Sequence, residues 1–221
     1  KYFFTIIFLL IGVSLWAFLP RQVMVSGSVF GTYYKVIVVG NRFQTNEESL
    51  KTAIMNCLDA INNDFSTYIS NSTIHKFNQL SDQYSISVSD DFYYVMGLSK
   101  RLHQLLEGAW DPTLLPLSRY YGFNDVPEED NVQHIESFVG FHYIDLLEHN
   151  KLKKLNPNVE LDLSSIVKGH AVDKVLALLK NEFNIQTGFV DIGGEIRVSG
   201  QKKWAIGIRA PKAVSELLSV I

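Results

Sequence analysis

Apolar residues recur along the chain at two spacings, and these spacings predict its helices and strands. Helical spacing predicts one helix after a T-x-x-E capping box at Thr45 and Glu48, a second from Ser89 to a stop at Gly108, and a third capped by Ser164 or Ser165. Runs of β-branched and aromatic residues predict strands at 28–39 (broken at residue 31), 152–155, 159–163, 188–192, 195–199 and 204–209. Helices alternating with hairpin-linked strands predict an α+β fold with a largely antiparallel sheet.

The first 21 residues form a separate segment. Residues 2–20 carry no charge, lie between Lys1 and Arg21, and as a helix would be roughly 28 Å long, enough to cross a bilayer. Bulky Trp16 and Phe18 stand where a cleaved signal peptide would need small residues, which favours an uncleaved anchor. We therefore expect residues 1–21 to be a membrane anchor or signal segment and residues 22–221 to form one domain outside the cytoplasm.

Composition narrows the function further. The 221 residues are 47% hydrophobic and 19% charged, as in globular proteins. A net charge of -3 gives no broad basic surface, so we expect no nucleic acid partner. The single cysteine, Cys57, lies on the apolar face of the first predicted helix and is expected to be a packing residue. The six histidines form no H-x-H or H-x-x-x-H pair, so no zinc centre is predicted.

Two segments carry candidate chemistry. Asp111 precedes Pro112 in a stiff loop, where it either faces a ligand or caps the short helix that follows. Asp162 ends a predicted strand, and Lys168 lies in the first turns of the next helix, a place that suits a phosphate. A solvated lysine on a capped amphipathic helix explains the second segment equally well, since the Walker A pattern is missing.

The glycine pair Gly193-Gly194 has two interpretations. It lets the backbone approach a ligand closely, but a two-residue hairpin turn explains both glycines as well. No G-x-S-x-G nucleophile elbow is present.

Five motifs, in order and spacing, resemble the FAD:protein FMN transferase family, also called ApbE. They are GSVFGTYY at 27–34, STY at 66–68 with STIHKFN at 72–78, GAWDPTLLPL at 108–117, LDLSSIVKGHAVD at 161–173 and GGEIRVSG at 193–200. The resemblance covers nearly all of residues 27–211.

The resemblance implies a fold, a reaction and a set of site residues. It implies an ApbE-like (T-fold-like) domain that uses Mg²⁺, cleaves FAD, moves FMN onto a Thr or Ser hydroxyl of a target flavoprotein, and releases AMP. By position, the residues expected to contact FAD are Phe30 (where the family usually has Met), Tyr68, Ala109, Trp110, Asp111, Asp162 and Lys168. Ser165 is expected to offer Mg²⁺ an oxygen. The resemblance also implies a location at the bacterial inner membrane, with the domain facing the periplasm.

The C-terminal end looks incomplete. It stops on an apolar pair without a cap, whereas family members continue with an Asp and a Thr that complete the magnesium shell. We therefore expect the 221-residue chain to bind FAD poorly and not to turn over. Two alternatives stay open: a FAD-binding or FAD-hydrolysing protein of the same fold, and an inactive membrane-tethered fragment.

Overall fold

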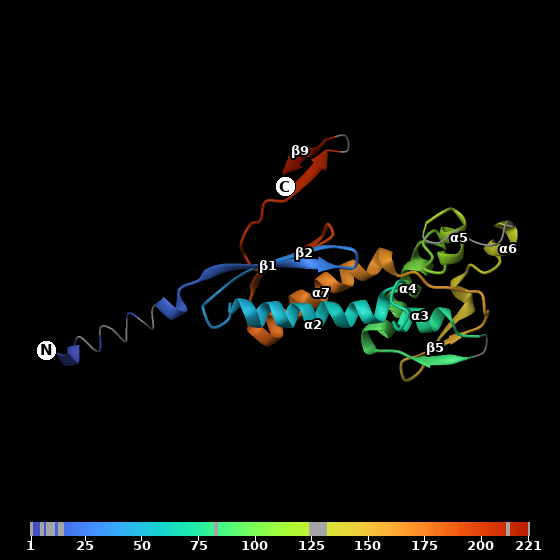
Figure 1. Cartoon of the computed structure of the whole chain (residues 1–221), viewed down its shortest axis with the longest axis horizontal. Helices are drawn as coiled ribbons and strands as arrows, with labels where there is room; N and C mark the ends of the chain where they lie inside the picture. The colour runs from blue at the N-terminus through green and yellow to red at the C-terminus, as the bar shows by residue number, and fades with distance from the viewer. Residues whose placement is uncertain are drawn as a thin grey trace. The chain divides into compact units, whose positions relative to one another are not determined.

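The computed structural model describes residues 2–4, 7, 12, 16–81, 84–123, 132–210 and 213–220, and the chain divides into two compact units (Figure 1). The first unit comprises Lys1–Ser28, Thr32–Ile54 and Val172–Ile221, and the second comprises Val29–Gly31 and Met55–Ala171. Two long helices, α2 (Glu47–Phe65) and α7 (Ser164–Phe183), contribute residues to both.

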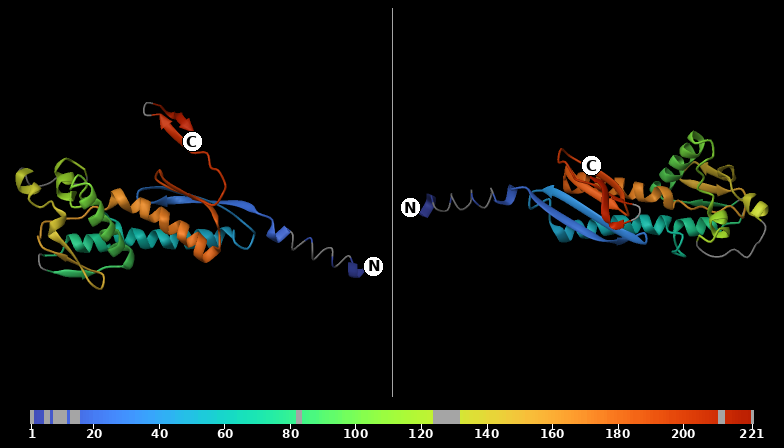
Figure 2. Two further views of the ribbon diagram at one scale, coloured as in Figure 1. Left: turned by 180° about the vertical axis from the view of Figure 1, so that it is seen from behind. Right: turned by 90° about the horizontal axis from the view of Figure 1, so that it is seen from above.

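The first unit is built on a four-stranded sheet. Its strands, in the order β1-β2-β6-β7, are β1 (Arg21–Val29), β2 (Thr32–Gly40), β6 (Thr187–Ile192) and β7 (Glu195–Ser199). β6 pairs antiparallel with both β2 and β7, which confirms the predicted hairpin at Gly193-Gly194. A second antiparallel pair, β8 (Gly207–Ala210) with β9 (Ala213–Val220), ends the chain, as Figure 2 shows.

The glycine pair is required by the turn itself. Both glycines have positive φ, and a Cβ on Gly193 would lie 2.7 Å from Cγ2 of Thr32. The hairpin interpretation therefore accounts for the pair.

The second unit carries the shorter elements. Its helices are α3 (Thr73–Asn78), α4 (Asp90–Leu105), α5 (Leu115–Tyr120), α6 (Val132–Glu136) and the 3₁₀ turn η1 (Phe141–Tyr143). A three-stranded antiparallel sheet, in the order β3-β5-β4, contains β3 (Ser85–Ser87), β4 (Ile144–Leu147) and β5 (Lys151–Lys154).

Apolar spacing places the core as predicted. In the first unit, buried side chains of α2, α7 and the sheet include Leu50, Ile54, Val175, Leu179, Val36, Val38 and Val190. In the second unit they include Leu58, Ile61, Phe77, Phe92, Met96, Leu152 and Leu161. Ser89 caps α4 as predicted, since its side chain accepts a hydrogen bond from the amide of Phe92, and Cys57 is half-buried on α2.

Two predicted helix caps are wrong. The amide of Ser49 donates to the side chain of Asn46, whereas the hydroxyl of Thr45 donates to the carbonyl of Asn41. The N-cap of α2 is therefore Asn46, because Thr45 is already engaged in the preceding turn. At α7 neither serine caps the helix, since the carboxylate of Asp162 accepts from the amide of Ser164 at 2.8 Å.

The strand predicted at 159–163 is also wrong. The segment is extended and alternately buried, but its only ladder contact among the described residues is a parallel bridge between Leu114 and Glu160. The strand predicted at 204–209 begins instead at Gly207.

Nine of the nineteen residues 2–20, where the membrane anchor is predicted, lie outside the described residues. Within the described part of the chain, no helix combines the length and apolar character needed to span a bilayer. The anchor stays a prediction.

Candidate functional site

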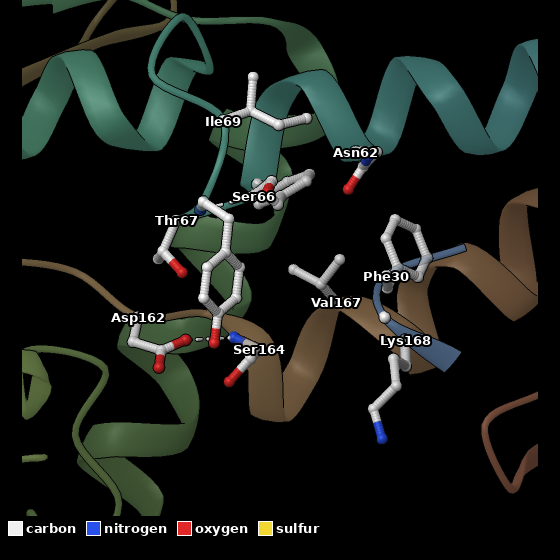
Figure 3. A pocket seen from close by; sticks show the side chains of 12 residues that line it. Phe30, Asn62, Ser66, Thr67, Ile69, Asp162, Ser164, Val167 and Lys168 are labelled. Atoms are coloured by element: carbon white, nitrogen blue, oxygen red, sulfur yellow. Dashed lines mark hydrogen bonds between the residues drawn. The ribbon is translucent and has the colours of Figure 1, made fainter. Parts of the chain in front are cut away.

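A pocket of about 430 Å³ opens in the second unit, beside the start of α7 (Figure 3). Its volume lies in the range of small-molecule and cofactor sites. Four of the residues predicted for FAD line it: Phe30, Tyr68, Asp162 and Lys168. In Figure 3, Asn62 and Ser66 face the pocket from the α2 side, and Asp162, Ser164, Val167 and Lys168 come from the α7 side.

The pocket has an aromatic wall. Phe30 and Gly31 form the two-residue turn between β1 and β2, and both have positive φ (53° and 70°). A bulky side chain in this conformation is strained, and such strain is often found at functional sites. Tyr68 follows α2 and is 83% exposed, so its ring is available to a planar ligand.

The polar wall is the corner that leads into α7. Asp162 is fixed at two points: its amide donates to the carbonyl of Pro112 at 2.8 Å, and its carboxylate accepts from the amide of Ser164. Lys168 lies one turn into the helix and is half-buried. The amide of Ser164 is occupied by the carboxylate of Asp162, so an anionic ligand is favoured here by the ammonium of Lys168 and the positive end of the α7 dipole.

The loop with Ala109, Trp110 and Asp111 lies next to this corner but is not among the lining residues. The indole Nε1 of Trp110 donates to Oγ of Ser165 at 3.2 Å, so the structure brings these two predicted residues together. The amide of Ala109 donates to the carbonyl of Leu106.

Asp111 is engaged by its own loop, by η1 and by His103 of α4. Its carboxylate is largely buried and accepts hydrogen bonds from the amide (2.8 Å) and hydroxyl (2.6 Å) of Thr113 and from the amide of Phe141 (3.2 Å). Nδ1 of His103 lies 3.2 Å from the same carboxylate. Asp111 thus shapes the loop rather than capping α5, whose N-cap Leu114 has no side-chain cap hydrogen bond.

Comparison with known proteins identifies the family. Residues 30–221 match the sequence model of the ApbE family, which is most of the chain. The chain belongs to the ApbE family. The FAD:protein FMN transferases of Vibrio cholerae and Haemophilus influenzae are 32% and 34% identical to it, over 90% and 89% of this ApbE chain.

Solved ApbE structures share the fold. The flavin transferase ApbE from Vibrio cholerae aligns with a TM-score of 0.79 at 32% identity, covering 87% of this chain and 65% of that one. The ApbE protein of Thermotoga maritima aligns with a TM-score of 0.76 at 26% identity, covering 91% and 67%. The predicted family and α+β fold class are confirmed. The chain spans about three fifths of the length of the two curated relatives, 63% and 61%.

Two residues that the sequence analysis did not identify, Asn78 and Lys154, hold the segment that leads to Asp162 in the ApbE pocket. The side chain of Asn78 bonds both the amide and the carbonyl of Leu161, and Nζ of Lys154 donates to the carbonyl of Asn78. Burial lowers the pKa of Lys154 from 10.5 to about 8, and the carboxylate of Glu160 opposes part of that fall. Strand alternation was the available signal, because it places Lys154 on the same buried face as Leu152.

The described residues contain no cluster of acidic, histidine or cysteine side chains for a metal. Among them, no group of three or more His, Cys, Asp or Glu side chains could hold a metal. Ser165 would offer one hydroxyl oxygen, whereas Mg²⁺ needs about six oxygen ligands, some of them water.

Proposed function

We propose that this protein is a FAD:protein FMN transferase and that the pocket beside α7 supplies its contacts to FAD. The observation that carries the proposal is the meeting of Phe30 and Tyr68 with Asp162 and Lys168 in one pocket. The relatives from Vibrio cholerae, Haemophilus influenzae and Chlamydia muridarum are named FAD:protein FMN transferases, which supports the same reaction.

The two walls of the pocket match the two halves of the ligand's chemistry. A flavin ring is planar and largely apolar, so the aromatic side chains of Phe30 and Tyr68 suit it. The diphosphate is anionic, so the ammonium of Lys168 and the positive end of the α7 dipole suit it. Trp110, held on Ser165, and the adjacent Ala109 and Asp111 are proposed to complete the contacts.

In the proposed reaction, the hydroxyl oxygen of a Thr or Ser on a target flavoprotein bonds to the phosphorus of the FMN half. The pyrophosphate bond to AMP breaks, AMP takes the electron pair of that bond, and the hydroxyl proton passes to solvent. This chain's residues bind and orient the diphosphate for that exchange. Mg²⁺, with Ser165 as one ligand, belongs to the proposal through the family resemblance; when bound, it would neutralise phosphate charge.

The test is a titration of the purified chain with FAD, followed by flavin fluorescence. Lys168→Ala is expected to weaken FAD binding about tenfold, which corresponds to about 1.4 kcal/mol, because it removes the ammonium beside the diphosphate. Lys180→Ala, on an exposed position of the same helix, is the matched control and should leave the affinity unchanged. Equal affinities in the wild type and Lys168→Ala would contradict the proposed site.

Turnover is measured separately, by mass spectrometry of an acceptor protein incubated with the chain, FAD and Mg²⁺. Added FMN mass indicates transfer and would overturn the expectation that the 221-residue chain does not turn over. Free FMN and AMP without covalent flavin indicate hydrolysis and favour the hydrolase alternative.

We also propose that residues 2–20 anchor the protein in the bacterial inner membrane with the pocket in the periplasm. The uncharged apolar run supports this. Protease treatment of spheroplasts tests it: the domain should be digested from outside, and protection of the intact chain would refute the orientation.

A further inference from the structure

Lys154 is a charged residue with no solvent exposure. It is the last residue of β5, and the alternation of that strand turns it to the same buried side as Leu152. An ammonium group loses hydration when it is buried, so it needs hydrogen-bond partners there. A methionine of similar length would fill the same space without that loss, so packing alone does not require a lysine at this position.

The partner of Lys154 is the end of α3. Its Nζ donates to the backbone carbonyl of Asn78 at 2.7 Å, and it lies 5.7 Å from the ring centroid of Phe77. Asn78 is the last residue of α3, where carbonyls have no partner inside the helix. The ammonium therefore satisfies a helix-end carbonyl and fixes the backbone from which the Asn78 side chain projects.

The side chain of Asn78 in turn holds the segment that leads into the pocket. Its Nδ2 donates to the carbonyl of Leu161 at 3.0 Å, and its Oδ1 accepts from the amide of Leu161 at 2.8 Å. Both polar backbone groups of Leu161 are thus satisfied by one amide side chain, as a neighbouring strand would otherwise do. Leu161 directly precedes Asp162, which lines the pocket.

We propose that Lys154 and Asn78 are positioning residues for the pocket: Lys154 fixes Asn78, Asn78 fixes Leu161, and Leu161 sets the place of Asp162. The consequence for FAD rests on the proposed function, whereas the placement of Asp162 does not. The lowered pKa of Lys154 agrees with the cost of keeping a charge at this place.

The experiment combines three variants, Lys154→Met, Asn78→Ala and the double variant, with Lys153→Met as control. Lys153 is the neighbouring residue of β5 and lies on the other face of the strand. Hydrogen exchange followed by mass spectrometry reports the amides of Leu161 and Asp162 without any ligand. FAD titration reports affinity, and thermal unfolding reports stability.

We expect faster exchange at Leu161 and Asp162 and about tenfold weaker FAD binding in Lys154→Met and in Asn78→Ala. The double variant should bind FAD no more weakly than Asn78→Ala, because both residues act through one chain of contacts. Lys153→Met should match the wild type in exchange and affinity. A role in folding alone would lower the unfolding temperature and leave the affinity of the folded protein unchanged.

Unchanged exchange at Leu161 and Asp162 in Lys154→Met would overturn the proposal, as would additive losses of affinity in the double variant. If Lys154→Met does not fold, Lys154→Gln keeps a polar donor at the position and is measured in the same way, and Asn78→Ala tests the contact to Leu161 by itself. If FAD binding to this chain is too weak to titrate, as the sequence leads us to expect, the exchange data still decide whether Lys154 and Asn78 hold Asp162 in place.

Discussion

Lys154 links the chemistry of a single residue to the stability of the fold. Its ammonium is buried, and its pKa falls to about 8 from 10.5. Between these two pH values the unfolded chain holds a proton that the folded chain has lost. The stability of the folded state should therefore rise with pH across this window, whereas below pH 8 the full cost of the buried charge is present.

The matching prediction compares the wild type with Lys154→Met in urea unfolding from pH 7 to pH 10.5. The unfolding free energy of the wild type relative to the variant should rise by about 3 kcal/mol over this range, because only the wild type loses the buried charge. Lys153→Met should keep the wild-type slope, since it leaves the buried ammonium in place. A constant difference between wild type and Lys154→Met would show that the folded protein does not depress this pKa.

Phe30 is expected to matter more for FAD binding than for the stability of the fold. Its backbone has a φ of 53°, a conformation that disfavours a bulky residue by roughly 1–2 kcal/mol. Phe30→Gly relieves this strain and adds flexibility to the unfolded chain, so stability should change by no more than about 1 kcal/mol. FAD affinity should fall about tenfold, because the aromatic wall is lost.

Chemical unfolding and FAD titration of Phe30→Gly measure the two effects separately. Gly31→Ala is the counterpart: it keeps the aromatic wall but puts a Cβ at a φ of 70°, so it should lose about 1 kcal/mol of stability. A large loss of stability in Phe30→Gly would contradict this account.

At the scale of elements, the N-terminus of α2 shows that a local sequence motif can indicate the wrong capping residue. Asn46 caps α2 although Thr45 and Glu48 match a capping box. Asn46→Ala should therefore destabilise the protein by about 1 kcal/mol in chemical unfolding. Glu48→Ala should cost less, since the box does not form; the reverse order would restore Thr45 as the cap.

The strands and their two-residue turns are predictable because their signals are local. Runs of β-branched and aromatic residues with the paired glycines identify β6 and β7, and the break at Gly31 separates β1 from β2. Residues 159–163 also have the sequence of a strand, but their backbone groups bond to Asn78 and Pro112 instead of a neighbouring strand. Such partners lie far away in sequence, so no local pattern reveals them.

The candidate site was predictable only where local motifs mark its residues. Ordered motifs identify Phe30, Tyr68, Asp162 and Lys168, which the fold brings to one pocket. The supporting contact of Lys154 with Asn78 spans 76 positions and depends on which face of a short strand is buried. It becomes visible only in three dimensions.

At the scale of the whole molecule, a ligand that binds only the folded state must raise its stability. FAD at one hundred times its dissociation constant should add about 2.7 kcal/mol to the unfolding free energy. Calorimetry should show a higher unfolding temperature for the wild type and, at the same FAD concentration, a smaller shift for Lys168→Ala. Equal shifts in both proteins would place the binding of FAD elsewhere.

Because the amine of Lys154 is buried, its chemical modification reports local opening of the folded protein. A fully covered amine does not react with acylating reagents until a local opening brings it to solvent, where it reacts like an ordinary lysine. In a brief treatment with an acetylating reagent, the exposed lysines should be modified first and Lys154 last. The rate of acetylation of Lys154 would then measure how often the protein opens locally around this buried side chain.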